Sequence, residues 1–321
     1  MAMNLLLTGA GAVGLNLAAT LLSSGNRVSI HARGNTLKAI AGDGIHRSGL
    51  FGSLDFPASA IEYLSDDLGD FPEGHYDFIL IATKTLANHE LSDELAAHRD
   101  LLAPGGKLVI FQNGWGNDEE YLRNFQKEQI CSARVITGCQ RTAPNRTTVT
   151  VHTAPLLLGN LYGLDPSPLE PLAEGFRKGG FPSEVTNEIG KALWAKLLYN
   201  CTLNPLGAVL GVEYGALTEC PETVEIMNDL MDEIFHVMHA AGLSTYWDTA
   251  EEYRKEFYGK LVPDTYHHSS STLQDIRKKQ KTEIGTLTGK ILELGKQYHV
   301  PVPANTMLYR LIRAMEANYQ T

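Results

Sequence analysis

The stretch LWAKLLYNCTLNPL, residues 193–206, places one lysine and two asparagines at every fourth position of an otherwise apolar segment. Positions four apart share one side of an α-helix, so Lys196, Asn200 and Asn204 predict a polar stripe about 80° wide beside the apolar face. These side chains offer an ammonium donor and two amides that both donate and accept hydrogen bonds. We therefore expect the stripe to lie at a boundary between packed parts of the protein and not in open solvent. A solvated edge with a snorkelling lysine is the alternative, although asparagine is a poor choice there.

A proline and a glutamate accompany this stripe. Pro205 lacks a backbone donor and disfavours helix at the residue before it, which predicts a kink at Asn204. Glu283 lies in SSSTLQDIRKKQKTEIGTL, residues 269–287, where it borders the apolar arc of a predicted helix that the serines suit as an N-terminus. Taken alone, Glu283 is explained by a surface ion pair with Lys279, four residues earlier.

The N-terminal segment predicts a dinucleotide-binding element. The apolar run 4–8 leads into GAGAVG, then into a helical pattern over 15–25 and a second strand over 26–32. In this order of strand, turn, helix and strand, the motif G-x-G-x-x-G indicates a pyrophosphate site at a helix N-terminus. The glycines permit the tight turn, the approach of phosphate and the packing of helix on strand. The candidate cofactor-binding turn is Gly9, Ala10, Gly11, Ala12, Val13 and Gly14.

The end of the second strand indicates which dinucleotide binds. NAD sites place a carboxylate there for the ribose 2′-hydroxyl, but IHARGN, residues 30–35, is followed by no carboxylate before Asp43. Arg33 stands where a 2′-phosphate would lie, and a guanidinium can bind phosphate through two N–H groups. We therefore expect NADP(H) as the cofactor. An ordinary surface arginine is the alternative.

Two further apolar strands end in polar residues. YDFILIATK, residues 76–84, and GGKLVIFQNGWGN, residues 105–117, are typical of buried parallel strands. Ligands bind beyond the C-terminal ends of such strands, where Lys84 and Asn113 fall. Both are therefore candidate ligand-binding residues, although Asn113 could instead cap a following helix. More strands are expected over 131–181, in an order that the pattern leaves open.

From about residue 189 the pattern is helical and shows no strand alternation. Five stretches fit helices: 188–211, 220–242, 247–260, 272–300 and 304–320. The fold class is therefore α/β, with an N-terminal dinucleotide-binding domain over 1–185 and an all-α substrate and catalytic domain over 186–321. The helical domain is large enough for its own core.

The bulk properties of the 321 residues exclude several classes of partner. A net charge of −10 disfavours nucleic acid and anionic membranes. The sequence has no apolar run of about 18 residues, the length that indicates a membrane helix, and its start lacks the basic leader and small-residue cleavage site of a signal peptide. Its four cysteines are scattered and its histidine pairs lack acidic or cysteine partners. We therefore expect reduced thiols, a cytoplasmic location and no metal site.

Four stretches carry a family resemblance that runs nearly end to end. GAGAVG, QNGWGN (112–117), LWAKLLYNCTLNPL and SSSTLQDIRKKQKTEI (269–284) resemble the ketopantoate reductases, or 2-dehydropantoate 2-reductases. The last two together are specific to that family. The resemblance implies a Rossmann domain, an all-helical domain and an active site in the cleft between them. It also implies NADPH-dependent reduction of a small 2-keto acid, 2-dehydropantoate, to pantoate, a step toward pantothenate and coenzyme A.

The resemblance also implies roles for individual residues. It makes Lys196 the general acid, which stabilises and protonates the alkoxide formed when hydride reaches the ketone carbon. It makes Glu283 the active-site glutamate, which accepts a substrate hydroxyl and is coupled to Lys196. It implies a 2′-phosphate site at Arg33. The substrate-binding positions that it implies are Asn113, also near the nicotinamide, Asn200, Asn204 and Ser271.

The chain departs from the family pattern at several positions, among them Thr272 in STLQD, where the family usually reads S-M-L-Q-D. Where the family usually reads E-I-D-x-x-N-G, this chain reads EIGTLTG, with Gly285 and Thr288 in place of two polar groups. Tyr214 stands where some members place an asparagine for substrate. These departures leave open an NADPH-dependent reductase of another 2-keto acid, or a non-catalytic NADP(H)-binding regulatory protein. The helical domain could supply a homodimer surface, although no exposed heptad indicates one.

Overall fold

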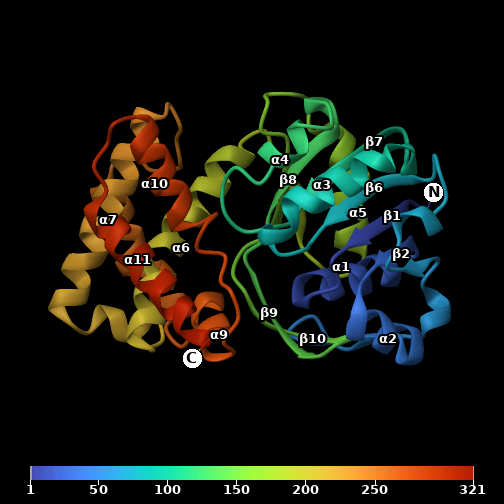
Figure 1. Ribbon diagram of the computed structural model, residues 1–321, viewed down its shortest axis with the longest axis horizontal. Coiled ribbons are helices and arrows are strands. Elements are labelled where there is room, and N and C mark those ends of the chain that lie inside the picture. The colour runs from blue at the N-terminus through green and yellow to red at the C-terminus, as the bar shows by residue number, and fades with distance from the viewer. Residues whose placement is uncertain (1, 321) are drawn as a thin grey trace. The chain divides into compact units, whose positions relative to one another are not determined.

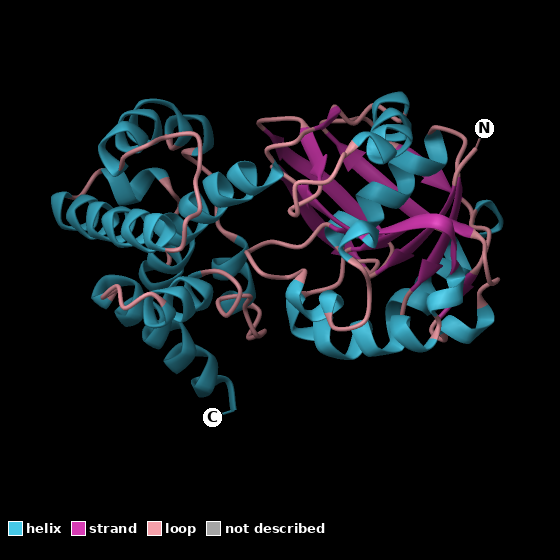
Figure 2. Cartoon of the chain, turned by 90° about the horizontal axis from the view of Figure 1, so that it is seen from above, coloured by secondary structure: helices cyan, strands magenta, loops and turns pink. Residues whose placement is uncertain are grey.

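The computed structural model describes residues 2–320. It divides into two compact units, the first formed by Met1–Gln112 with Asn117–Ile189 and the second by Asn113–Gly116 with Gly190–Thr321. The first unit is α/β (Figure 1), and the described residues of the second contain helices and no strand (Figure 2). The predicted fold class is therefore confirmed. The division falls slightly beyond the expected boundary at 185–186, and residues 113–116 group with the helices.

An eight-stranded sheet forms the centre of the first unit. Its order is β12-β11-β8-β7-β6-β1-β2-β5, with β11 antiparallel to β8 and the other neighbouring pairs parallel. The order reverses between β1 and β6, which creates the switch point where doubly wound sheets bind ligands. This is a Rossmann-type topology. The strands are β1 (Asn4–Thr8), β2 (Arg27–His31), β5 (Leu64–Ser65), β6 (Tyr76–Ile81), β7 (Leu102–Ile110), β8 (Ile130–Arg134), β11 (Leu156–Gly159) and β12 (Ser183–Val185).

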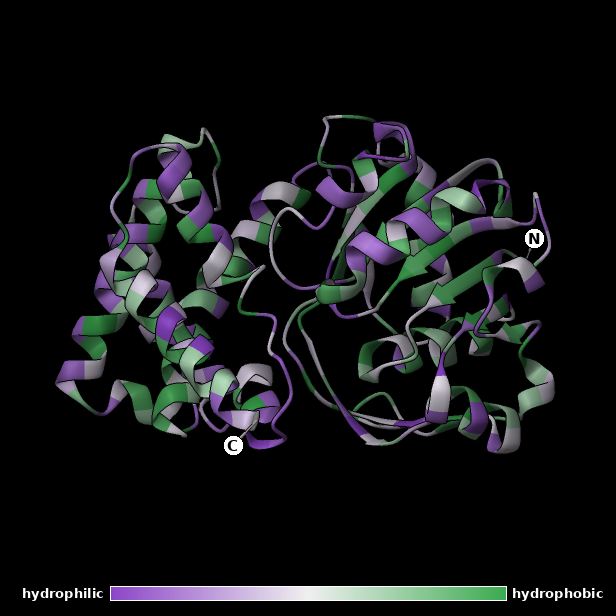
Figure 3. Ribbon diagram, viewed as in Figure 1, coloured by the Kyte–Doolittle hydropathy of each residue, from purple (hydrophilic) through white to green (hydrophobic). Residues whose placement is uncertain are grey.

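Helices cover both faces of this sheet, which explains its continuous apolar strands (Figure 3). Leu5 and Leu7 of β1 join one core with residues of α1 and α5, whereas Leu6 joins a second core with residues of α3 and α4. Successive side chains of a strand point to opposite faces, so each face needs its own apolar set. The helices are α1 (Ala12–Ser23), α2 (Gly34–Asp43), α3 (Asn88–Ala97), α4 (Glu119–Leu122) and α5 (Glu170–Lys178).

A second, four-stranded sheet contains two of the strands in residues 131–181 whose order the sequence left open. Its order is β4-β3-β10-β9, with β3 parallel to β10 and the other two pairs antiparallel. Strands β10 and β3 pack on α1. The second sheet therefore supports the helix that follows the glycine-rich turn. Its strands are β3 (Ile45–Gly49), β4 (Leu54–Phe56), β9 (Thr137–Ala143) and β10 (Arg146–His152).

The second unit packs its helices around a core that includes Trp194, Met231 and Phe257. None of the helices in residues 2–320 combines the length and hydropathy that a bilayer-spanning helix requires. The helices are α6 (Ile189–Leu210), α7 (Pro221–Ala240), α8 (Ala250–Glu256), α9 (Ser271–Arg277), α10 (Thr288–Gln297) and α11 (Pro303–Ala317).

One helix prediction needs correction. The stretch 272–300 is not one helix, because α9 ends at Arg277 and α10 begins at Thr288. Lys279 has φ +53°, which no helix interior adopts, so the expected i,i+4 helical pair with Glu283 does not form. In α6, the chain continues as helix through Pro205 to Leu210, in agreement with the helix predicted over 188–211. Pro205 only removes the N–H that would bond to the carbonyl four residues earlier.

Candidate active site

The turn after β1 has the geometry that close approach of a phosphate requires. Gly9 has φ +94°, and a Cβ there would lie 2.5 Å from the Thr83 backbone nitrogen. A Cβ at Gly14 would lie 2.0 Å from the Gly9 carbonyl oxygen. Packing within the protein therefore requires glycine at both positions. A Cβ at Gly11 would meet no atom within 4 Å, so glycine there leaves open space at which a ligand can approach the backbone.

The N-terminus of α1 also fits an anion. Gly11 caps the helix without a side-chain hydrogen bond, and the first turn contains no acidic residue. The first N–H groups of a helix lack intrahelical partners and carry partial positive charge. Thr147 of β10 steadies the turn by donating its hydroxyl to the Ala12 carbonyl oxygen at 2.9 Å. The turn therefore fits the diphosphate of a dinucleotide.

Two cations lie at strand ends on either side of β1. Arg33 follows β2 as the N-terminal cap of α2, and its side chain is 61% exposed. Its Nη2 donates to Oε2 of Glu94, on α3, at 2.7 Å. Lys84 follows β6, is exposed, and accepts the Ala87 N–H on its carbonyl oxygen at 3.1 Å. Both residues therefore stand at C-terminal strand ends, as expected, and Arg33 already has an acidic partner.

The polar stripe of α6 is buried to different degrees along its length. Asn200 and Asn204 are 9% and 3% exposed, whereas Lys196 is half-buried. The solvated-edge alternative is therefore wrong for the asparagines. Burying an amide costs free energy unless the amide finds hydrogen-bond partners. The two asparagines are thus expected to bond to other protein groups or to a ligand.

Asn113 contacts the lysine of this stripe. Lys196 Nζ donates to Asn113 Oδ1 at 2.5 Å, although the two residues are 83 positions apart in the chain. The amide oxygen is neutral, so this contact orients the ammonium group without cancelling its charge. An oriented ammonium group can stabilise a developing oxyanion.

The loop that carries Asn113 also contacts the segment that begins with Glu283. Gly114 has φ +98°, and a Cβ there would lie 2.3 Å from the Thr286 carbonyl oxygen. The Trp115 N–H donates to that same oxygen at 3.2 Å. The Thr286 N–H donates in turn to the carbonyl oxygen of half-buried Glu283 at 3.2 Å. The loop therefore links Lys196 to the turn that contains the predicted glutamate.

The serine that was expected to bind substrate begins α9. Ser270 rather than Ser271 caps this helix, because its buried Oγ accepts the Leu273 N–H at 3.0 Å. The Ser270 hydroxyl also lies 3.5 Å from the Asn204 carbonyl oxygen. Ser271 is exposed in the first turn. The cap therefore holds the start of α9 against the asparagine end of the stripe and leaves the Ser271 side chain at the surface of the unit.

Tyr214 has a structural role that the sequence did not indicate. It is 3% exposed, and its hydroxyl donates to Asn204 Oδ1 at 2.5 Å. Burial raises the pKa of Tyr214 well above its usual value, so the phenol stays protonated at neutral pH. Because Tyr214 occupies the amide oxygen, Asn204 presents its NH₂ group to any further partner. The only signal in the sequence was the tyrosine's departure from the family pattern.

Comparison with known proteins connects this arrangement to one family. The family model "Ketopantoate reductase PanE/ApbA" matches residues 5–162, and "Ketopantoate reductase PanE/ApbA C terminal" matches residues 188–316. A 2-dehydropantoate 2-reductase of Aquifex aeolicus is 33% identical over 317 residues, which cover 98% of each chain. The chain belongs to the ketopantoate reductase family. It is an NADP-dependent oxidoreductase, as the resemblance implied.

Further relatives cover the whole chain. A 2-dehydropantoate 2-reductase of Vibrio cholerae is 27% identical and covers 99% of both chains. The crystal structure of a PanE/ApbA family ketopantoate reductase from Ralstonia eutropha JMP134 matches with TM-score 0.85 and 26% identity, over 99% of this chain and 100% of that chain. A D-mandelate dehydrogenase bound to NADH and anilino(oxo)acetate has the same TM-score and coverage at 20% identity. The ketopantoate reductase fold thus also occurs in an enzyme with a different named substrate.

Two departures from the usual ketopantoate reductase pattern lie in different surroundings. Thr288 is fully buried at the first residue of α10. Gly285 is exposed, and a Cβ there would meet no atom within 4 Å. Thr288 therefore affects packing of the core, whereas Gly285 removes a polar side chain from an open position near Glu283.

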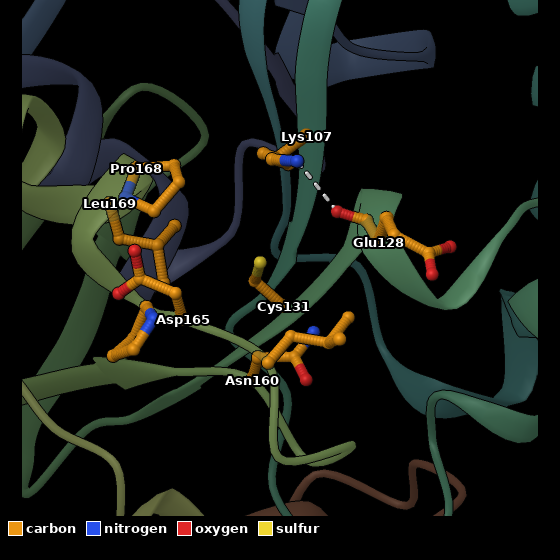
Figure 4. Close-up of a pocket in the computed structure, with 9 residues that line it drawn as sticks. Lys107, Glu128, Cys131, Asn160, Asp165, Pro168 and Leu169 are labelled. Atoms are coloured by element: carbon orange, nitrogen blue, oxygen red, sulfur yellow. Dashed lines mark hydrogen bonds between the residues drawn. The ribbon is translucent and has the colours of Figure 1, made fainter.

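A separate pocket lies elsewhere in the first unit (Figure 4). Cys131, the second residue of β8, lines it, and Lys107 donates to the Glu128 carbonyl oxygen at 2.7 Å. Burial raises the pKa of the Cys131 thiol to about 11, so the thiol is protonated at neutral pH. The pocket lies toward the N-terminal end of β8, whereas the glycine-rich turn follows the C-terminal end of β1. It is therefore not part of the candidate site.

Replacing Tyr214 by phenylalanine tests how this ketopantoate reductase orients Asn204. We expect Tyr214→Phe to raise KM for the keto acid about fivefold with little change in kcat, since one hydrogen bond of about 1 kcal/mol is lost and the amide is free to turn. Tyr199→Phe is the matched control, because the Tyr199 hydroxyl pairs with Thr265 Oγ1 instead. The measurements are KM and kcat from steady-state kinetics on both variants, together with thermal unfolding to check that both remain folded. Equal KM values for the two variants would contradict this role of Tyr214.

Proposed function

We propose that this enzyme reduces 2-dehydropantoate to pantoate with NADPH, a step toward pantothenate and coenzyme A, and that Lys196 is the proton donor. The observation that carries the proposal is the Lys196 ammonium group held by the Asn113 amide on a helix that also carries Asn200 and Asn204. Full-length relatives that are named 2-dehydropantoate 2-reductases support the choice of substrate.

The residues of the second unit would do the acid–base work. Bound NADPH supplies the hydride that reduces the ketone carbon. As negative charge develops on the ketone oxygen, Lys196 Nζ stabilises it and transfers one proton to it. The hydrogen bond to Asn113 Oδ1 fixes the orientation of the ammonium group, so that another of its N–H bonds can point toward the ketone oxygen. The new hydroxyl group of pantoate is neutral, and Lys196 recovers its proton from solvent.

The neighbouring polar groups would hold the keto acid. The Asn204 NH₂ group is directed by Tyr214, so it donates to a carboxylate or hydroxyl oxygen. Asn200 offers a second amide one turn earlier on α6, and Ser271 offers a hydroxyl at the start of α9. Glu283 accepts a hydrogen bond from a substrate hydroxyl. Together these groups favour a small molecule that carries both a carboxylate and a hydroxyl, as 2-dehydropantoate does.

The residues of the first unit would hold the cofactor. The glycine-rich turn binds the diphosphate through the N–H groups at the start of α1. Arg33 binds the 2′-phosphate, and Lys84 adds a second positive charge at the end of β6. The open space above Gly11 supports this assignment, because the protein's own packing does not require glycine there.

A second candidate is the reduction of another 2-keto acid. Gly285 favours it, because the usual ketopantoate reductase pattern places a polar residue at this open position. With that side chain missing, one polar group that could contact the substrate is lost, so discrimination for the hydroxyl of ketopantoate is weaker.

A substrate panel distinguishes the two candidates. With NADPH, we expect kcat/KM for ketopantoate to exceed that for 2-ketoisovalerate, pyruvate and phenylglyoxylate by at least about tenfold, because only ketopantoate offers a hydroxyl to Glu283. The measurement is the initial rate of NADPH oxidation for each acid, repeated with NADH. If a keto acid without a hydroxyl gives the highest kcat/KM, the proposal for ketopantoate is wrong and the second candidate stands.

A further inference from the structure

The end of β2 lacks the acidic residue that NAD sites place there, but α3 supplies an acidic residue near the same position. No carboxylate lies between the end of β2 and Asp43, which favours a 2′-phosphate over a 2′-hydroxyl. In the folded chain, however, Glu94 of α3 places its Oε2 at 2.7 Å from Arg33 Nη2. A carboxylate therefore stands beside the guanidinium group that the proposed function assigns to the 2′-phosphate.

Each carboxylate oxygen of Glu94 lies near a side-chain nitrogen, and Arg33 Nη2 is the nearer of the two. The other carboxylate oxygen, Oε1, lies 3.9 Å from His31 Nε2. His31 is 5% exposed, and its burial lowers its pKa, so the imidazole is neutral at neutral pH. His31 Nε2 also lies 3.1 Å from the Asp66 carbonyl oxygen, which the neutral ring can satisfy as a donor. Glu94 is 27% exposed and pairs with Arg33 at 2.7 Å.

This pairing has opposite consequences for the two nicotinamide cofactors. A phosphate group that binds Arg33 would lie within a few ångströms of the Glu94 carboxylate. The two negatively charged groups would then repel each other. A ribose 2′-hydroxyl carries no charge, and a carboxylate is the group that NAD sites use to accept its hydrogen bond. Glu94 therefore disfavours the phosphate and favours the hydroxyl.

We propose that Glu94 is a cofactor-specificity residue, which weakens the preference for NADPH set by Arg33 and allows NADH to bind as a second cofactor. The inference rests on the proposed function, because it takes Arg33 as the site of the 2′-phosphate. It assigns to α3 a role that the second strand has in NAD-specific Rossmann folds.

Cofactor binding to the Glu94→Gln variant tests the inference. The change removes the charge and keeps the size of the side chain. We expect the Kd for NADPH to fall about two- to fivefold, the range for an exposed ion pair, while the Kd for NADH stays equal or rises. The ratio of the two dissociation constants, Kd for NADH over Kd for NADPH, should therefore rise at least about twofold. Titration of nicotinamide fluorescence in the full-length protein measures both values.

The matched control is Asp93→Asn, which removes one negative charge from the adjacent position of α3. Asp93 pairs with Arg123 and not with Arg33, so the ratio should stay at the parent value. An unchanged or lower ratio in Glu94→Gln would overturn the inference, and a lower ratio would mean that Glu94 prepares Arg33 for phosphate.

Arg33→Gln separates this inference from the proposal beneath it. If Arg33→Gln leaves the Kd for NADPH unchanged, the assignment of Arg33 to the 2′-phosphate is wrong. If Arg33→Gln weakens NADPH binding and Glu94→Gln leaves the ratio unchanged, only the role of Glu94 is wrong.

Discussion

Lys196→Ala is expected to lower kcat/KM for ketopantoate by about 10³-fold, because it removes both the proposed proton donor and the positive charge proposed to stabilise the alkoxide. The loss should fall mainly on kcat, since the interaction strengthens as the oxygen becomes negative. The Kd for NADPH should stay within about twofold of the parent value, because the residues assigned to the cofactor are untouched. Single-turnover rates of NADPH oxidation measure the chemical step directly.

Lys191→Ala is the matched control for this prediction. Lys191 is also half-buried on α6 but lies about 140° away around the helix from Lys196. We expect its kcat/KM to remain within about twofold of the parent value. Lys196→Arg keeps the charge but changes the position of the donor, so it should recover part of the binding and little of the rate. A Lys196→Ala variant that retains a tenth of parental kcat would refute the assignment of Lys196 as proton donor.

Gly114→Ala should cause the next largest loss. Gly114 has φ +98°, and the added Cβ would lie 2.3 Å from the Thr286 carbonyl oxygen. The backbone must move, which displaces Asn113 on one side and the turn containing Glu283 on the other. We expect the free energy of unfolding to fall by about 1–3 kcal/mol and kcat/KM to fall about 100-fold, since small displacements of reacting groups have large effects on rate.

Gly285→Ala provides the comparison, because it adds the same methyl group in a neighbouring turn. A Cβ at Gly285 meets no atom within 4 Å, and its φ lies outside the left-handed range. Its unfolding free energy should change by less than about 0.5 kcal/mol. Urea unfolding and steady-state kinetics on both variants are the measurements. Similar stabilities for Gly114→Ala and Gly285→Ala would show that the contact with Thr286 does not constrain the loop.

Local patterns in the sequence were sufficient for the class of the fold and for its most regular elements. The apolar run before GAGAVG, the helical period after it and the strand at 26–32 correspond to β1, α1 and β2. The glycine spacing, the absent carboxylate before Asp43 and the four-residue spacing on α6 are likewise visible without a structure. Each of these signals depends on residues close in sequence, whose relative positions follow from the geometry of one strand, turn or helix.

Tertiary structure alone decided which distant groups meet. It joined Asn113 to Lys196, Tyr214 to Asn204 and Glu94 to Arg33. The helical periodicity of the sequence continues from α9 to α10, but the structure is not helical between them. The turn at 283–286 in this interval packs on the loop that carries Asn113. Such contacts depend on how chain segments far apart in sequence close on one another, and hydrophobic periodicity reports only which face of a segment is buried, not the partner it meets.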